Sequence, residues 1–246
     1  MLKEDEIILI EGAYQMGIEL KESQQKDFSR YLELLREENQ KVNLTSLETP
    51  REIIIKHFLD SFTCLEVINQ YAKIKDIELV DIGTGAGFPG LPLKIICPEK
   101  IRLFLIEAKK KKVLFLKKLI KELNLEGIQI LEGRAETWGR NSEHREKYDI
   151  AISRAVAPLN ILAEYSLPLV KIGGWFIAQK GKSYPAEIEN SISAINLLGG
   201  RLVKVEKAKV PFLNQERFIL KFEKIKNTPL KYPRREGIPL KRPLYF

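Results

Sequence analysis

The apolar positions follow a helical period in the first part of the chain and a strand period afterwards. Within residues 1–70 they recur every three or four positions, as at Phe28, Leu32 and Leu35, and polar residues fill the opposite face. This spacing predicts amphipathic helices. One helix is expected to open at Thr49-Pro50, because proline is tolerated at the first helical position. Residues 1–70 are therefore predicted to form an N-terminal helical extension.

Seven apolar runs of strand length follow. They are Glu78–Ile82, Ile101–Ile106, Ile128–Leu131, Asp149–Ser153, Gly174–Lys180, Leu202–Lys207 and Phe218–Phe222. Crossover helices fit between the first five, most clearly at Lys109–Leu123, so these strands should be parallel. The last two are separated by the short segment Ala208–Arg217, which favours an antiparallel hairpin. A seven-stranded, Rossmann-like α/β sheet of this kind is the class I methyltransferase fold, and we expect it over residues 71–223.

The net charge of the chain indicates which class of molecule it binds. The chain has 246 residues, with 41 Lys and Arg against 33 Asp and Glu, and a formal net charge of +8. Its surface should therefore attract polyanions. Much of the excess lies in residues 224–246, where seven basic residues stand against one acidic residue. We expect this basic C-terminal tail to pack on or beside the domain, and a solvated tail is the alternative.

Several classes of protein are excluded by what the sequence lacks. The two cysteines, Cys64 and Cys97, are too few for a disulfide framework or a multi-cysteine zinc site, and no metal is expected. The N-terminus has no apolar signal core, and no apolar run reaches membrane-spanning length. We therefore expect a cytoplasmic protein that does not contact the membrane.

A glycine-rich loop follows the first predicted strand. Asp81 ends that strand, and Gly83, Gly85 and Gly87 follow at alternate positions, where glycine lets the backbone turn tightly beside a ligand. The stretch from Gly85 to Gly90 also satisfies the dinucleotide fingerprint G-x-G-x-x-G. A carboxylate two positions before the loop suits a pyrophosphate poorly. It suits the ammonium and sulfonium groups of S-adenosyl-L-methionine, so the loop favours this methyl donor.

Three further strand ends carry candidate cofactor residues. Glu107, after the second strand, can accept the hydroxyls of a ribose, unless it is a surface acid paired with nearby lysines. After the third strand, the backbone N–H of Ala135 and the carboxylate of Glu136 can meet an adenine; the alternative for Glu136 is an acid at a helix N-terminus. Arg154, after the fourth strand, can hold a phosphate, a carboxylate or a base, or form a structural ion pair.

Motifs along nearly the whole chain resemble those of one family. They are Asn43-Leu44-Thr45, His57-Phe58-Leu59-Asp60-Ser61, the run Asp81–Leu93, Arg134-Ala135-Glu136, Ser153-Arg154-Ala155, Lys180-Gly181 and the run Tyr232–Gly237. These segments are similar to the RsmG (GidB) family, which methylates guanine N7 in the decoding region of bacterial 16S ribosomal RNA. The resemblance implies S-adenosyl-L-methionine as cofactor and 16S ribosomal RNA, or the small ribosomal subunit, as partner.

The resemblance also implies roles for individual residues. Cofactor contacts would be made by Gly83, Phe88, Ala135, Glu136 and Arg154. The RNA face would include the segment from Asn43 to Asp60 and five basic residues, Lys180, Arg234, Arg235, Lys241 and Arg242. We further hypothesise that Asn43, Asp60 and Arg154 hold the target base. His57 is expected to be a core histidine, and a surface pair with Lys56 is the alternative for Asp60.

Guanine N7 carries an in-plane lone pair, so its methylation requires placement of the base and no general base. The absence of the Asp/Asn-Pro-Pro-Tyr motif and of a Pro-Cys nucleophile fits that chemistry. A small-molecule methyltransferase and an RNA-binding protein without catalysis remain open, and an NAD(P) oxidoreductase is a more distant alternative. A monomer is expected, and naked RNA and the assembled particle both stay open as substrates.

Overall fold

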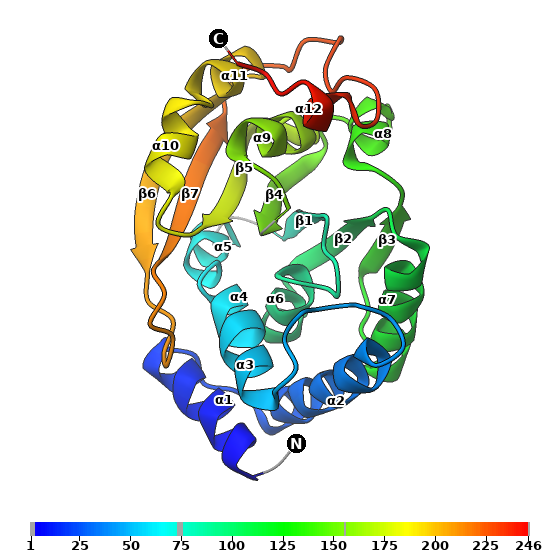
Figure 1. Ribbon diagram of the computed structural model, residues 1–246, viewed down its shortest axis with the longest axis vertical. Coiled ribbons are helices and arrows are strands. Elements are labelled where there is room, and N and C mark those ends of the chain that lie inside the picture. Colours follow the sequence, from blue (N-terminus) through cyan, green and yellow to red (C-terminus); the bar gives the residue numbers. More distant parts are fainter. Residues whose placement is uncertain (1–2, 73–75, 155, 246) are drawn as a thin grey trace.

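The computed structural model describes residues 3–72, 76–154 and 156–245, and a single sheet lies at its centre (Figure 1). The seven strands lie in the order β3-β2-β1-β4-β5-β7-β6. Their bounds are β1 Ile77–Ile82, β2 Ile101–Glu107, β3 Ile128–Glu132, β4 Tyr148–Arg154, β5 Val170–Lys180, β6 Gly200–Ala208 and β7 Arg217–Lys224. The first five pair in parallel, whereas β7 is antiparallel to both β5 and β6. The predicted strands and the terminal hairpin are confirmed.

Apolar residues alternate across the sheet and build two cores. In β1, Leu79 belongs to one core and Val80 to the other. The first face is covered by α2 (Glu22–Asn39), α6 (Gly90–Ile96) and α7 (Lys110–Glu122), and the second by α8 (Ala135–Arg140), α9 (Leu159–Ser166) and α11 (Ile192–Leu197). Since side chains alternate with a period of two, Asp81 lies on the face of Leu79, where it meets α6.

The N-terminal helices are part of the first core. They are α1 (Lys3–Gln15), α2, α3 (Pro50–Ile53), the π-helix η1 (Ile54–Leu59), α4 (Asp60–Phe62) and α5 (Leu65–Ala72). Leu9 and Phe58 are fully buried in the same cluster as Leu79 of the sheet. As predicted, Pro50 is the first residue of α3, and the structure adds that the Thr49 side chain caps this helix. The helical extension and the sheet therefore share one core, and the segment boundaries at 70 and 223 stay predictions.

The C-terminal residues fold back against the second face of the sheet. Figure 1 shows them beside α8, α9 and α11, at the end of the view opposite α1 and α2, and they include α12 (Ile238–Lys241). Tyr232 and Leu244 are buried, and Arg145 donates to the Tyr232 carbonyl at 2.7 Å. Lys224 is fully buried and donates to Thr228 Oγ1. Tyr232, Leu244 and Lys224 therefore attach the tail to the domain, and Lys224 is not available to a partner, whereas Lys226, Lys231, Arg235, Lys241 and Arg242 are exposed.

Candidate active site

A cavity of about 560 Å³ opens at the carboxyl ends of β1, β4 and β5. The loop after α2, η1, α4, the glycine loop, the start of α7 and the start of β7 all contribute to its walls. It brings together six of the predicted site residues, namely Asp60, Gly83, Gly85, Phe88, Arg154 and Lys180. These residues come from distant parts of the chain and meet at the sheet edge where sequence analysis placed the cofactor. The structure has a cavity at that edge.

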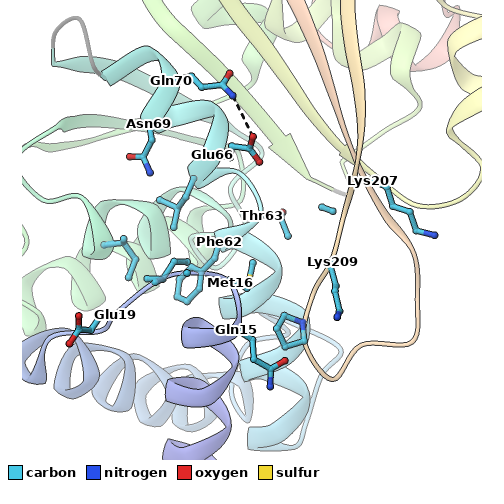
Figure 2. Close-up of a pocket in the computed structure, with 16 residues that line it drawn as sticks. Gln15, Met16, Glu19, Phe62, Thr63, Glu66, Asn69, Gln70, Lys207 and Lys209 are labelled. Carbon is cyan, nitrogen blue, oxygen red and sulfur yellow. Dashed lines mark hydrogen bonds between the residues drawn. The ribbon is translucent and has the colours of Figure 1, made fainter.

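A second and larger cavity, of about 1070 Å³, lies between the end of α1, α5 and the β6–β7 hairpin. Figure 2 shows amide and carboxylate side chains along it, among them Glu66 and Gln70, which are joined by a hydrogen bond of 3.5 Å. None of the predicted cofactor residues lines this cavity. Size alone does not make an active site, so the smaller cavity at the strand ends is the candidate.

The glycine loop adopts the left-handed backbone that its composition predicts. Gly83, Gly85 and Gly87 have φ angles of 66°, 64° and 103°. A Cβ atom added to Gly87 would lie 2.5 Å from the Tyr31 hydroxyl and 2.4 Å from a Leu91 methyl group. Glycine is therefore required at position 87 both by its backbone angle and by the close packing of α2 and α6.

Asp81 lies beneath this loop with one carboxylate oxygen unpaired. Its Oδ2 accepts hydrogen bonds from Thr84 Oγ1 (2.7 Å) and from the Gly90 backbone N–H (2.9 Å). Its Oδ1 is buried and has no hydrogen-bond partner among the described residues. Burial raises the pKa of the Asp81 carboxyl to about 6. A buried, unpaired carboxylate oxygen is costly, and the ammonium group of S-adenosyl-L-methionine would supply the missing donor, so the site fits the predicted cofactor.

Glu107, at the end of β2, is tied to the same loop. Its Oε2 accepts from the Gly85 backbone N–H at 3.0 Å, and its Oε1 accepts from the Lys109 backbone N–H at 2.7 Å. The carboxylate is thus held by two backbone groups, and each of its oxygens keeps a lone pair. This placement is compatible with the predicted ribose contact, which stays a prediction.

Ala135 and Glu136 begin α8 and are both buried outside the cavity lining. Glu136 Oε1 accepts a hydrogen bond of 3.0 Å from the backbone N–H of Gly237, in the C-terminal segment. The C-terminal segment therefore lies beside the residues that are predicted to contact the adenine. The adenine contacts of these two residues stay predictions.

Asp60, at the start of α4, is the centre of an ion-pair cluster on the opposite wall. Its Oδ2 accepts from Arg154 NH1 at 2.9 Å, and its Oδ1 accepts from Arg217 Nε at 3.0 Å. Asp60 is 2% exposed, so both oxygens are directed at guanidinium groups and away from solvent. The alternative pair with Lys56 is wrong, because Lys56 binds Glu52 at 2.7 Å. The ion-pair alternative for Arg154 is realised, whereas its cofactor contact stays a prediction.

His57 is held as a neutral imidazole. Arg154 NH2 lies 2.9 Å from His57 Nδ1, and since a guanidinium can only donate, Nδ1 must accept. The proton is thereby assigned to Nε2, which donates to Thr45 Oγ1 at 2.8 Å. Burial, and then the charge of Arg154, lower the pKa of His57 to about 3. His57 therefore cannot serve as a cation near neutral pH, and both ring nitrogens are occupied.

An aromatic stack connects His57 to the glycine loop. The Phe88 ring lies between the rings of His57, at a centroid distance of 4.3 Å, and Tyr31, at 5.3 Å. The Tyr31 hydroxyl donates to the Ala86 carbonyl at 2.6 Å. Phe88 is 5% exposed, so most of its ring serves to fix the loop against η1 and α2. Its cofactor contact stays a prediction.

The other predicted residues lie farther from this centre. Asn43 is exposed on the loop after α2 and does not line the cavity, although Leu44 does. Lys180 lines it and binds Glu187 Oε2 at 2.7 Å. The tail residues Arg234, Arg235, Lys241 and Arg242 are outside the cavity lining. Arg234 binds the buried Glu164 through Nε and NH2, at 2.9 and 2.6 Å.

Gln179 and Arg217 are two of the cavity residues that were not found from the sequence. Gln179 donates from Nε2 to the Asp60 carbonyl at 2.6 Å and to Thr63 Oγ1 at 2.9 Å. A polar residue at the end of an apolar strand is a signal that could have identified it. Arg217 carries no such signal, because it reaches Asp60 only through the pairing of β7 with β5.

Comparison with known proteins assigns the family. The family model described as rRNA small subunit methyltransferase G matches residues 24–218. A ribosomal RNA small subunit methyltransferase G of Alkaliphilus metalliredigens is 45% identical over 98% of this chain and 99% of its own length. The protein of that name from Dictyoglomus thermophilum is 47% identical over 96% of each chain.

Solved structures support the fold. A SAM-dependent methyltransferase from Aquifex aeolicus superposes with a TM-score of 0.52 at 14% identity, over 74% of this chain and 97% of its own. No described helix is long and apolar enough to cross a membrane, and the described part of the chain holds no cluster of potential metal ligands. With the family model covering most of its length, the chain belongs to the rRNA small subunit methyltransferase G family.

Proposed function

We propose that this protein transfers the methyl group of S-adenosyl-L-methionine to N7 of a guanine in the decoding region of 16S ribosomal RNA. The observation that carries the proposal is the unpaired Asp81 oxygen beneath a left-handed glycine loop, in a chain of this family. The cofactor supplies an electrophilic methyl group. Asp81 would hold its ammonium group, Glu107 its ribose, and Ala135 and Glu136 its adenine.

The remaining residues would place the acceptor. Guanine N7 attacks through its own lone pair, so no group has to remove a proton first. This agrees with His57, whose pKa of about 3 and two occupied nitrogens disqualify it as a general base near neutral pH. Arg154 lines the cavity, and its Nε–H has no acceptor among the described residues, so it can donate to an acceptor atom of the base.

The acceptor class is supported by charge. Among the cavity residues, five are basic (Lys56, Lys112, Arg154, Lys180 and Arg217) and two are acidic (Asp60 and Glu187). A basic cavity attracts the phosphates of RNA, whereas a neutral small molecule would not need it. We further propose that the protein acts in the cytoplasm, as a monomer, on 16S ribosomal RNA or the small ribosomal subunit; its membership of the rRNA small subunit methyltransferase G family supports this substrate.

Labelled methyl transfer tests this proposal. Small subunits and naked 16S ribosomal RNA that lack the N7 modification are incubated with labelled S-adenosyl-L-methionine, and the RNA is then digested to nucleosides. We expect labelled 7-methylguanosine with the wild-type protein and none with Asp81→Ala. Label in another nucleoside, or transfer to small molecules alone, would contradict the assigned acceptor. Binding of both ligands without transfer would favour the non-catalytic alternative.

A further inference from the structure

Arg217 enters the active-site cavity from the far end of the chain. It is the first residue of β7, and the antiparallel pairing of Phe218 with Lys180 places it beside the end of β5. Its side chain is 19% exposed and lies in the cavity wall. None of the family motifs in the sequence includes this residue, so its presence in the site is a product of the fold.

The Arg217 guanidinium is held by Asp60 at Nε, and its two terminal nitrogens lie at the exposed end of the group. Nε donates to Oδ1 of the buried Asp60 at 3.0 Å. NH1 donates to the Glu216 carbonyl at 3.2 Å and NH2 to Gln215 Oε1 at 3.3 Å, both at the exposed end. An arginine has five N–H donors, so within the described part of the chain one donor on each terminal nitrogen has no acceptor. The group is therefore held in place before any ligand arrives.

The charges around Arg217 are not balanced. Lys56 and Lys180 have their own carboxylate partners, Glu52 and Glu187. Arg217 and Arg154 share the single carboxylate of Asp60. One positive charge around Asp60 is therefore not matched by a carboxylate, and a planar guanidinium with donors on both terminal nitrogens matches the geometry of a phosphate.

We propose that Arg217 binds a backbone phosphate of the nucleotide that enters the cavity, with Asp60 holding its guanidinium beside Arg154. This rests on the proposed function in one respect, namely that the acceptor is RNA. Asp60 then acts as a positioning residue for both arginines. The base would face the glycine loop and Arg154, and its phosphate would face the hairpin.

Variants of Arg217 test the assignment, with Lys209→Gln as the matched control. Lys209 is an exposed lysine of the same hairpin that lies outside this cavity (Figure 2), so its substitution removes one charge at a different place. We would measure the KM for RNA at several salt concentrations, the kcat, the affinity for S-adenosyl-L-methionine by calorimetry, and the melting temperature. Fluorescence anisotropy of labelled RNA adds a readout that does not depend on methyl transfer.

For Arg217→Gln we expect the KM and the Kd for RNA to rise about 10- to 100-fold, because one charge-assisted contact is lost. The slope of log affinity against log salt should fall by about one, with cofactor affinity within about twofold of wild type. Arg217→Lys should restore the salt slope, since it keeps the charge. Lys209→Gln should change RNA affinity less than about threefold.

Two results would overturn the assignment. One is an unchanged RNA affinity and salt slope in Arg217→Gln. The other is a loss of cofactor affinity and melting temperature with RNA affinity intact, which would make Arg217 a structural support for Arg154. If the wild-type protein binds RNA but forms no 7-methylguanosine, the proposed function fails, and the anisotropy series still decides the role of Arg217.

Discussion

Two buried aspartates near the active-site cavity are paired differently: Asp60 lies in the cavity wall, whereas Asp81 lies beneath the glycine loop, outside the lining. Asp60 is paired on both oxygens with guanidinium groups from β4 and β7. Asp81 has two donors on one oxygen and none on the other. A carboxylate whose oxygens are all paired holds the protein together, whereas a buried oxygen without a partner is costly unless a ligand completes it. We therefore infer that Asp60 positions Arg154 and Arg217, whereas Asp81 binds a ligand.

Removing the Asp60 carboxylate should give the largest effect on stability. In Asp60→Ala, Arg154 and Arg217 lose their shared partner inside the cavity wall. We expect the free energy of unfolding to fall by about 3–5 kcal/mol, as for other broken buried pairs. Urea titration followed by circular dichroism would measure it. Lys56→Gln, which breaks the neighbouring exposed pair, is the control and should cost less than about 1 kcal/mol. Equal losses in both variants would contradict the structural role of the Asp60 carboxylate.

The next largest effect is expected in the glycine loop. Gly87→Ala forces a side chain onto a residue at φ 103° and into contact with Tyr31 and Leu91. We expect a loss of about 1–3 kcal/mol in stability, together with weaker cofactor binding because the loop must shift. Gly17→Ala is a useful control, since this glycine also has positive φ but has open space around it. Normal cofactor affinity in Gly87→Ala would show that the loop geometry is not needed for binding.

Asp81→Asn should separate binding from stability. The amide keeps an acceptor for Thr84 and Gly90 but loses the charge that would pair with an ammonium group. We expect cofactor affinity to fall about 10- to 100-fold, as for the loss of a charged hydrogen bond. The free energy of unfolding should not fall, because burial disfavours the charge in the free protein and the amide does not carry it. Calorimetry and urea titration on the same samples would check both values, and an unaltered affinity would contradict the role of Asp81.

The raised pKa of Asp81 predicts that cofactor affinity depends on pH. Burial raises the pKa of Asp81 from 3.8 to about 6, so its carboxyl becomes protonated as the pH falls through 6. Cofactor affinity should then decline below about pH 6. The same protonation stabilises the free protein between pH 6 and 3.8, since the charged form is the disfavoured one. Affinity measured from pH 5 to 8 would test this, and Asp81→Asn should abolish the decline.

His57 gives the smallest expected effect. With its pKa lowered to about 3, it remains neutral throughout the range in which the protein is folded and active. The kcat of the wild-type protein should therefore show no inflection between about pH 6.5 and 8.5 from this residue. A pH–rate profile with an inflection near 6.5 that is lost in His57→Gln would reassign His57 to acid–base chemistry.

Sequence periodicity predicted the fold more completely than the site. All seven strands and helix α7 lie where the apolar pattern predicts them, because each is a local consequence of alternation or of helical spacing. The glycine loop was also predicted, since the left-handed backbone at Gly83, Gly85 and Gly87 demands that residue. The side-chain partners were not. Asp60 was assigned to a surface pair with Lys56 or to the target base, and the fold pairs it with Arg154 and Arg217.

The sequence alone determined the order of elements, the glycine loop and the family motifs, because these depend on residues close together in the chain. The tertiary structure decided which charges meet. It buried Lys224, joined Arg234 to Glu164, and brought Arg217 to Asp60 across 157 positions of sequence. Ion pairs of this kind depend on how strands pair and helices pack. The composition of a basic tail or of a charged run therefore does not predict which charges pair.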